Sequence, residues 1–175
     1  MTHERAHPGS AEMTHRADGV LLDAVYVGDS GALQGVWTRY GDVAYWAAAS
    51  LTGDTTVATD AVVAAFGALG RSAGAARRPL PQHLIAAVRR RCPEPGTSST
   101  ARSTLVEDEG AAACRTAIRN LSDQQLTIVA LIMSGRFCAR EAASAVGVSR
   151  AEVCALLGEV LTTLAASPPV SSANS

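Results

Sequence analysis

The chain has 175 residues, a formal net charge of −1 and 47% hydrophobic residues, which suits one ordinary domain or two small ones. No apolar run reaches the roughly 18 residues of a membrane-spanning helix, so we expect no membrane span. The polar N-terminus has no apolar stretch of the secretory type, and we expect a cytoplasmic protein with reduced cysteines. The net charge alone indicates neither a nucleic-acid nor a membrane partner.

The charges are nevertheless segregated along the chain. Residues 1–70 carry three Arg and eight acids, residues 71–102 carry seven Arg and one acid, and residues 103–175 carry five Arg and seven acids. The three segments therefore have net charges of −5, +6 and −2. The basic middle segment is the part of the chain whose composition indicates an anionic partner.

The N-terminal part reads as a leader followed by helices. Residues 1–18 are polar and contain Pro-Gly-Ser, which predicts a disordered leader. Apolar residues then recur at helical spacing over 21–50, with Asp29 or Ser30 as the cap of the main helix. The same period resumes over 56–69, after an interruption at 53–54. The residues expected to face inward from the first long helix are Leu33, Val36, Trp37, Tyr40, Val43 and Ala44.

The basic segment contains one further helix and then a linker. Residues 71–78 read as a loop, and Pro81 suits the first turn of a helix over 82–91. Two prolines and a glycine after Cys92 end that helix. Residues 98–110 are rich in Ser and Thr and then acidic, which is typical of a linker.

The C-terminal part has clear helix boundaries. Capping boxes begin at Ser122 and at Ser149, and each opens a run of apolar residues at helical spacing. A short helix over 138–146 lies between them and ends at Gly147, which suits a tight turn. This order of helix, turn and capped helix predicts a helix-turn-helix, in which the last helix can enter a DNA groove.

No segment shows the alternation of a β-strand, so the predicted fold class is all-α. We expect two small helical domains joined by a flexible linker. The predicted boundaries are a leader at 1–18, a helical domain at 19–93, a linker at 94–110, a helix-turn-helix domain at 111–167 and a tail at 168–175.

Several segments, in this order, resemble the RNA polymerase sigma factors of the small two-domain extracytoplasmic-function group. Region 2 of that family is similar to residues 32–41, to LTGD at 51–54 and to ATDAVVAAF at 58–66. Region 4 is similar to residues 118–164, which include EAASAVGVS at 141–149. No single motif is specific, but their ordered series is, and it covers residues 20–92 and 111–166.

The resemblance implies a region 2-like bundle, a region 4-like helix-turn-helix, and the partners of a sigma factor. These partners are core RNA polymerase, promoter DNA and an anti-sigma factor. The positions that would contact core polymerase are Asp60, Val63 and Phe66. The positions that would contact DNA are Arg77, Arg78, Arg89, Arg90 and Arg91, together with Ser149 and Arg150 at the start of the last helix. The alternative interpretation of the five basic positions is a solvated basic face.

Departures from the family's pattern favour a second interpretation. No aromatic residue lies between Phe66 and Phe137, whereas promoter opening needs rings that stack on flipped-out bases. The last helix carries Arg150 against Glu152 and Glu159, so its charge repels duplex DNA. Its apolar arc is wide enough to suit a protein partner, and the predicted partner face consists of Val153, Leu156, Leu157, Val160, Leu161 and Leu164.

The sequence therefore leaves three functions open. The first is a divergent sigma factor that recruits core polymerase to promoters. The second is a sigma-like regulator that has lost promoter melting and binds polymerase, a sigma factor or an anti-sigma factor. The third is a module that self-associates through its last helix. We expect no enzyme, no metal site and no cofactor, because neither a catalytic constellation nor zinc-ligand spacing is present. A further hypothesis is that the acidic run at 107–109 covers and masks the basic surface at 77–91.

Overall fold

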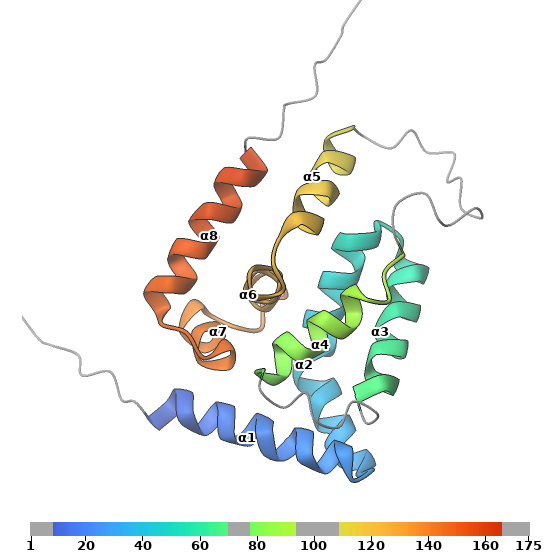
Figure 1. The fold of residues 1–175 in the computed structure, drawn as a ribbon, viewed down its shortest axis with the longest axis vertical. Coiled ribbons are helices and arrows are strands. Elements are labelled where there is room, and N and C mark those ends of the chain that lie inside the picture. The colour runs from blue at the N-terminus through green and yellow to red at the C-terminus, as the bar shows by residue number, and fades with distance from the viewer. Residues whose placement is uncertain (1–8, 70–77, 94–108, 166–175) are drawn as a thin grey trace, which may run out of the picture.

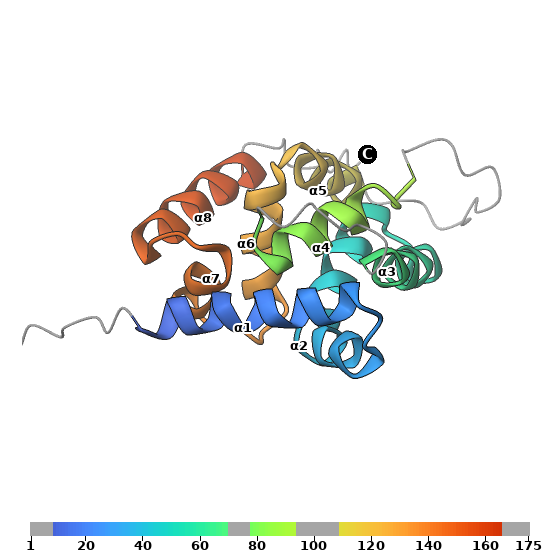
Figure 2. The ribbon, with the colours of Figure 1, turned by 60° about the horizontal axis from the view of Figure 1, so that its bottom comes forward.

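The computed structural model describes residues 9–69, 78–93 and 109–165 and is all-helical over these ranges, which confirms the predicted fold class. Figures 1 and 2 show the arrangement of the helices. We call α1–α4 with the turn up to residue 93 the first half, and α5–α8 the second half. The helices are α1 (Gly9–Tyr26), α2 (Ser30–Thr52), α3 (Thr55–Leu69), α4 (Leu80–Arg89), α5 (Glu109–Asn120), α6 (Asp123–Met133), α7 (Ala139–Val146) and α8 (Arg150–Ala165). None of these helices is long and apolar enough to span a membrane.

The helix ends follow the capping residues that the sequence predicts. The Asp29 carboxylate accepts hydrogen bonds from the first backbone N–H groups of α2. Gly53 ends α2 with a φ of 70°, and a Cβ there would come within 3.0 Å of the Arg115 side chain. Ser122 and Gln125 form the predicted capping box of α6.

One prediction about the N-terminus is wrong. Residues 9–18, expected to be disordered, form the first part of α1, while residues 1–8 lie outside the described residues. Tertiary contacts anchor this helix, because Asp18, Leu22 and Val25 are buried. Asp18 accepts a hydrogen bond from Tyr40, which lies 22 residues further along the chain. The composition of residues 9–18 cannot predict a contact with a residue so far along the chain.

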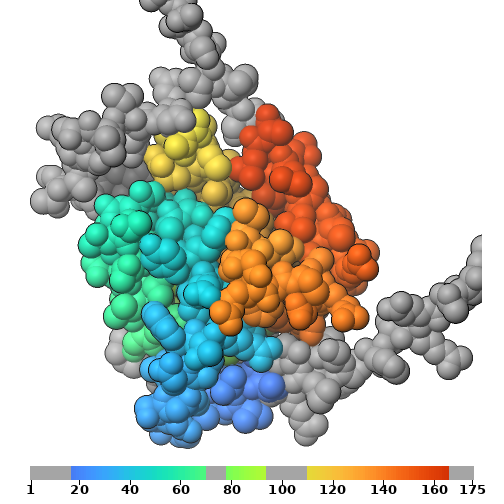
Figure 3. All heavy atoms as spheres, turned by 180° about the vertical axis from the view of Figure 1, so that it is seen from behind, coloured from blue at the N-terminus to red at the C-terminus, as the bar shows by residue number. Residues whose placement is uncertain are grey.

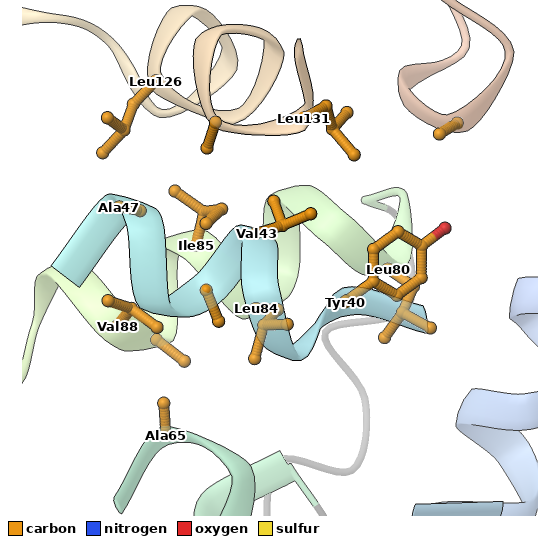
Figure 4. Packing of buried hydrophobic residues seen from close by; sticks show 14 of the residues in the cluster. Tyr40, Val43, Ala47, Ala65, Leu80, Leu84, Ile85, Val88, Leu126 and Leu131 are labelled. Atoms are coloured by element: carbon orange, nitrogen blue, oxygen red, sulfur yellow. The ribbon is translucent and has the colours of Figure 1, made fainter. Parts of the chain in front are cut away.

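The two halves share one hydrophobic core. Leu126, Ile128 and Leu131 of α6 are fully buried. A surface helix buries only one stripe of residues, whereas these three point to different sides of α6, so α6 is a central helix. Figure 4 shows Leu126 and Leu131 pointing towards α2 and α4, whose Val43 and Ile85 point back. In the space-filling view, atoms of the first half lie directly against those of the second (Figure 3). The halves are thus held by buried apolar contacts.

Polar and aromatic contacts add to this interface. Arg119 of α5 donates hydrogen bonds to the carbonyl oxygens of Leu51, at 2.6 Å, and Pro93, at 3.0 Å. The rings of Tyr40 and Phe137 are parallel, with their centroids 5.8 Å apart. Figure 2 shows α1 crossing beneath both halves, from α7 to α2. The interface therefore involves three helices of the first half.

The predicted domain boundaries stay a prediction. Most of the expected linker, at 94–108, and the whole tail lie outside the described residues. Helix α5 begins at Glu109, within the last residues assigned to the linker. The question that the sequence leaves open, whether the halves pack on each other, is answered by the shared core.

Candidate functional site

The three predicted polymerase-binding residues lie on α3, where two are exposed and one is buried. Asp60 is exposed and Val63 is 58% exposed, one helical turn apart on the outer side of α3. Phe66 is only 5% exposed, and its ring meets that of Trp37 edge-on at 4.7 Å. The expectation that Phe66 lies on a contact surface is therefore wrong, because its side chain is buried and its ring packs against Trp37 of α2.

Two aromatic residues complete this surface. Trp37 is 43% exposed and Tyr45 is 40% exposed, two helical turns apart on α2. Gly41 lies between them, and the Trp37 ring leans across it, with ring atoms 3.5 Å from where a Cβ would stand. A hollow of about 220 Å³ lies between α2 and α3 at this point; its lining includes Thr59 and Val62. We call Trp37, Tyr45, Asp60 and Val63 the α2–α3 face.

This role of α2 is not predicted from the sequence. The helical spacing of apolar residues predicts that Trp37 faces inward, and the 43% exposure of its side chain shows that this prediction is wrong. The signal that marks the surface is the spacing of Trp37, Gly41 and Tyr45, each four residues apart, with the small residue leaving room between two rings. Exposed aromatic rings are typical of the centre of protein interfaces.

The predicted DNA-binding arginines that the structure describes lie just before α4, at its last residue or just after it. Most of them make contacts within the protein. Arg78 and Arg89 both approach Asp123 of α6, at 3.4 and 3.5 Å. Arg89 also donates a 2.7 Å hydrogen bond to the carbonyl oxygen of Leu121. Arg91 donates to the carbonyl oxygen of Ala87 at the end of α4, where a cation also complements the helix dipole. Of the other two predicted positions, Arg90 is exposed and Arg77 lies outside the described residues.

His83 lies on α4 within the same basic environment. It is buried, and its pKa is lowered, first by burial and then by the positive charges of Arg90 and Arg78. The imidazole is therefore neutral at pH 7 and forms part of the interior. Around α4 the arginines provide the positive charge, and the histidine provides none.

The helix-turn-helix geometry is present in α7 and α8. Gly147 ends α7 with a φ of 76°, and the Ser149 hydroxyl accepts from the backbone of Glu152 in the predicted capping box. Buried Ala142 and Ala143 of α7 allow the helices to approach closely. Ser149 and Arg150 are exposed at the start of α8, as a phosphate contact requires. The pKa of Glu152 is lowered, chiefly because its carboxylate accepts from the Ser149 backbone N–H.

The predicted partner face of α8 is mostly used inside the protein. Val153 and Val160 are buried, and Leu156, Leu157 and Leu164 pack partly against the core. Among the six predicted residues, Leu161 alone is exposed, at 65%. The arc is wide because α8 packs on α5, α6 and α7 together, so its width does not require a partner. For Val153 and Val160 the assignment to a partner face is wrong.

Comparisons with known proteins find a partial likeness among solved structures. The chain matches no protein-family model and no curated protein. It aligns with a solved structure of CnrH in complex with the cytosolic domain of CnrY. The alignment covers 86% of this chain and 96% of the other, at 22% identity and a TM-score of 0.44.

Proposed function

We propose that the protein is a divergent sigma factor, which binds core RNA polymerase and directs promoter-specific transcription initiation. The observation that carries the proposal is the α2–α3 face. Asp60 and Val63 are exposed at the positions that the resemblance assigns to polymerase binding, and two exposed rings of α2 extend the surface. Aromatic anchors beside a charged rim suit a protein partner.

The charge of this face supports the same class of partner. Asp60 is the exposed acid of this face. Asp42 lines the hollow between Trp37 and Tyr45, but its charge is paired with Arg136 at 3.0 Å. Arg39, the cation of α2, is turned towards Asp18 on the other side of the helix. A partner with apolar anchors and a basic rim would therefore complement the surface.

A specific observation favours the second interpretation, a sigma-like regulator that has lost promoter melting. The outward side of α8 includes Cys154, Ala155 and Leu161, which offer no charge to a phosphate backbone. Affinity for duplex DNA comes largely from cations that neutralise phosphates. In this interpretation polymerase binding is retained and specific promoter contacts are lost.

Both interpretations place the protein in the cytoplasm, where it would meet polymerase and, as a further partner, an anti-sigma factor. Neither requires catalysis by this chain. Promoter DNA is a direct partner in the first interpretation and is bound weakly, or through polymerase, in the second. Polymerase binding is therefore the property to test first.

The decisive experiment is co-purification of the full chain with core RNA polymerase. Val63→Arg adds bulk and a positive charge at an exposed site of the α2–α3 face, so we expect it to remove most of the retained polymerase. Val20→Arg makes the same change at a comparably exposed site on α1 and should leave retention unchanged. The proposal fails when the unmodified chain retains no polymerase, or when the two variants behave alike.

Run-off transcription separates the two interpretations. A promoter-dependent transcript made by core polymerase and this chain supports the sigma factor. Stable polymerase binding without any transcript, on a library of promoter fragments, supports the regulator. A gel shift with the full chain gives a second readout, since salt-sensitive duplex binding counts against the regulator.

A further inference from the structure

One carboxylate of the second half faces two arginines of the first. Oδ2 of Asp123 is 3.4 Å from Nη1 of Arg78, and its Oδ1 is 3.5 Å from Nη1 of Arg89. Arg78 precedes α4 and Arg89 is its last residue, so both side chains extend along the helix towards the same acid. A single negative charge therefore lies between two positive ones.

Within the part of the chain that the structure describes, this arrangement leaves positive charge that is not neutralised. Both contacts are longer than the 2.7–2.9 Å or so of a strong charge-assisted hydrogen bond, and neither is bidentate. Among the described residues, none accepts a hydrogen bond from the buried Nε of Arg89. Arg90 follows Arg89 in the chain and is exposed, and its charge acts on His83 as that of Arg78 does. We call Arg78, Arg89 and Arg90 the α4 arginine cluster.

We propose that Asp123 is an internal competitor for nucleic-acid phosphates at the α4 arginine cluster. A carboxylate and a phosphate bind guanidinium groups through the same kind of N–H···O contacts. The Asp123 carboxylate therefore occupies the position that a phosphate would take between the two arginines. Binding of a duplex then requires the two arginines to exchange one anion for another. The inference rests on the proposed function only in naming nucleic acid as the anion, and polymerase does not enter it.

The exchange is local, and the halves stay together. The side chains of Arg78 and Asp123 are 59% and 35% exposed, and ion pairs with this exposure contribute little to stability. The halves are held instead by the buried core around Leu126 and by the hydrogen bonds of Arg119. Asp123 can therefore release the arginines while the shared core remains intact.

The test is the affinity of the full chain for a fluorescently labelled DNA duplex, measured by anisotropy over a range of salt concentrations. Asp123→Asn removes the competing charge and keeps the side-chain shape. We expect binding to become about two- to tenfold tighter, because the ion pairs that it removes are weak. The slope of log affinity against log salt should steepen by about 0.9 for each arginine that gains a phosphate.

A matched control lies elsewhere in the same interface. Asp42 of α2 pairs with Arg136 of the second half at 3.0 Å, so Asp42→Asn also removes one acid and one ion pair between the halves. It does not touch the α4 arginine cluster and should leave the salt slope unchanged. Equal gains from the two variants would mean that net charge alone is responsible, and the proposal would be overturned.

A second pair of variants does not depend on Asp123. Arg78→Gln should weaken duplex binding and flatten the salt slope, whereas Arg136→Gln, which removes the arginine of the control pair, should do neither. Adding Arg78→Gln to Asp123→Asn should cancel much of the gain, and far-UV circular dichroism checks the fold of each variant. Unchanged binding in Asp123→Asn and Arg78→Gln refutes the inference, whereas failure of polymerase co-purification refutes only the proposed function.

Discussion

The hydroxyl of Tyr40 donates a 2.7 Å hydrogen bond to the carboxylate of Asp18 at a point where both residues are buried. The carboxylate also lies 3.5 Å from Arg39, the neighbour of Tyr40 on α2. On its other side the Tyr40 ring stacks on Phe137 of the second half. This one tyrosine thus connects α1, α2 and the segment that leads into α7.

Replacing the tyrosine tests that connection. Tyr40→Phe keeps the ring but removes the donor, so the buried Asp18 carboxylate loses a hydrogen bond and the free energy of unfolding should fall by about 1–3 kcal/mol. Urea unfolding followed by circular dichroism measures the change. Tyr45→Phe removes the hydroxyl of an exposed tyrosine on the same helix and should leave stability within about 0.5 kcal/mol.

The same residue predicts how stability depends on alkaline pH. The pKa of Tyr40 is raised, first by burial and then by the charge and the hydrogen bond of Asp18. The unfolded chain ionises this tyrosine near pH 10 and the folded chain keeps the proton, so the contribution of Tyr40 to the free energy of unfolding should be constant below about pH 10 and fall above it. The chain has no lysine, which leaves tyrosines and cysteines as the side chains that titrate in this range. An equally steep decline in Tyr40→Phe would refute the assignment.

The shared core predicts that the halves unfold together. Leu126→Ala in α6 should cost about 2–5 kcal/mol, since it removes a fully buried side chain. Both tryptophans lie on α2 of the first half, so their fluorescence reports on the half that was not mutated. The urea midpoint should fall equally by tryptophan fluorescence and by circular dichroism. A fluorescence midpoint that stays in place would show that the halves are independent, and Leu161→Ala serves as the exposed control.

The cap of α8 should weaken in acid. The carboxylate of Glu152 accepts a 2.7 Å hydrogen bond from the Ser149 backbone N–H, which lowers its pKa. A lowered pKa means that the contribution is complete above the ordinary pKa of a glutamate and is lost as the pH falls through the folded value. The protection of the amides in the first turn of α8 against exchange, relative to their intrinsic rates, should therefore fall below about pH 4. Glu152→Gln should remove this pH dependence, and Glu159→Gln, beyond the cap, should keep it.

The α2–α3 face predicts a second effect on polymerase binding. Tyr45→Ala removes an exposed ring between two hollows of the surface, and its loss should lower affinity for core polymerase about tenfold or more, as at interface hot spots. Surface plasmon resonance with immobilised core polymerase measures the change. Val20→Ala, at an exposed site on α1, is the control. Equal affinities for the two variants would exclude Tyr45 from the interface.

Local chemistry explains which predictions are confirmed. The ends of α2, α6, α7 and α8 coincide with Asp29, Ser122, Gly147 and Ser149, because a cap acts on backbone groups only two or three residues away. The inward positions of α2 are confirmed where the apolar period is strongest, as at Val36 and Tyr40. Trp37 departs from the prediction because a large ring can cover Gly41 while keeping one edge in solvent.

Distance along the chain explains what the sequence does not show. Asp123 meets Arg78 and Arg89 across 45 and 34 positions, and no pattern within either segment marks the pairing. The sequence points to an acidic cover over the basic surface, but at 107–109. Residues 107 and 108 lie outside the described residues, and the acid that the structure places beside Arg78 and Arg89 is Asp123.

From the residues alone one can predict that the chain is helical, where most helices begin and end, and that its positive charge is concentrated in one segment. These properties depend on neighbours within one or two helical turns. Three other properties follow from the packing of the helices: the two halves share a core, Phe66, Val153 and Val160 are interior, and Asp123 faces the α4 arginines. Each of these depends on which apolar stripes are buried against one another, and that choice is made by packing among all the helices at once.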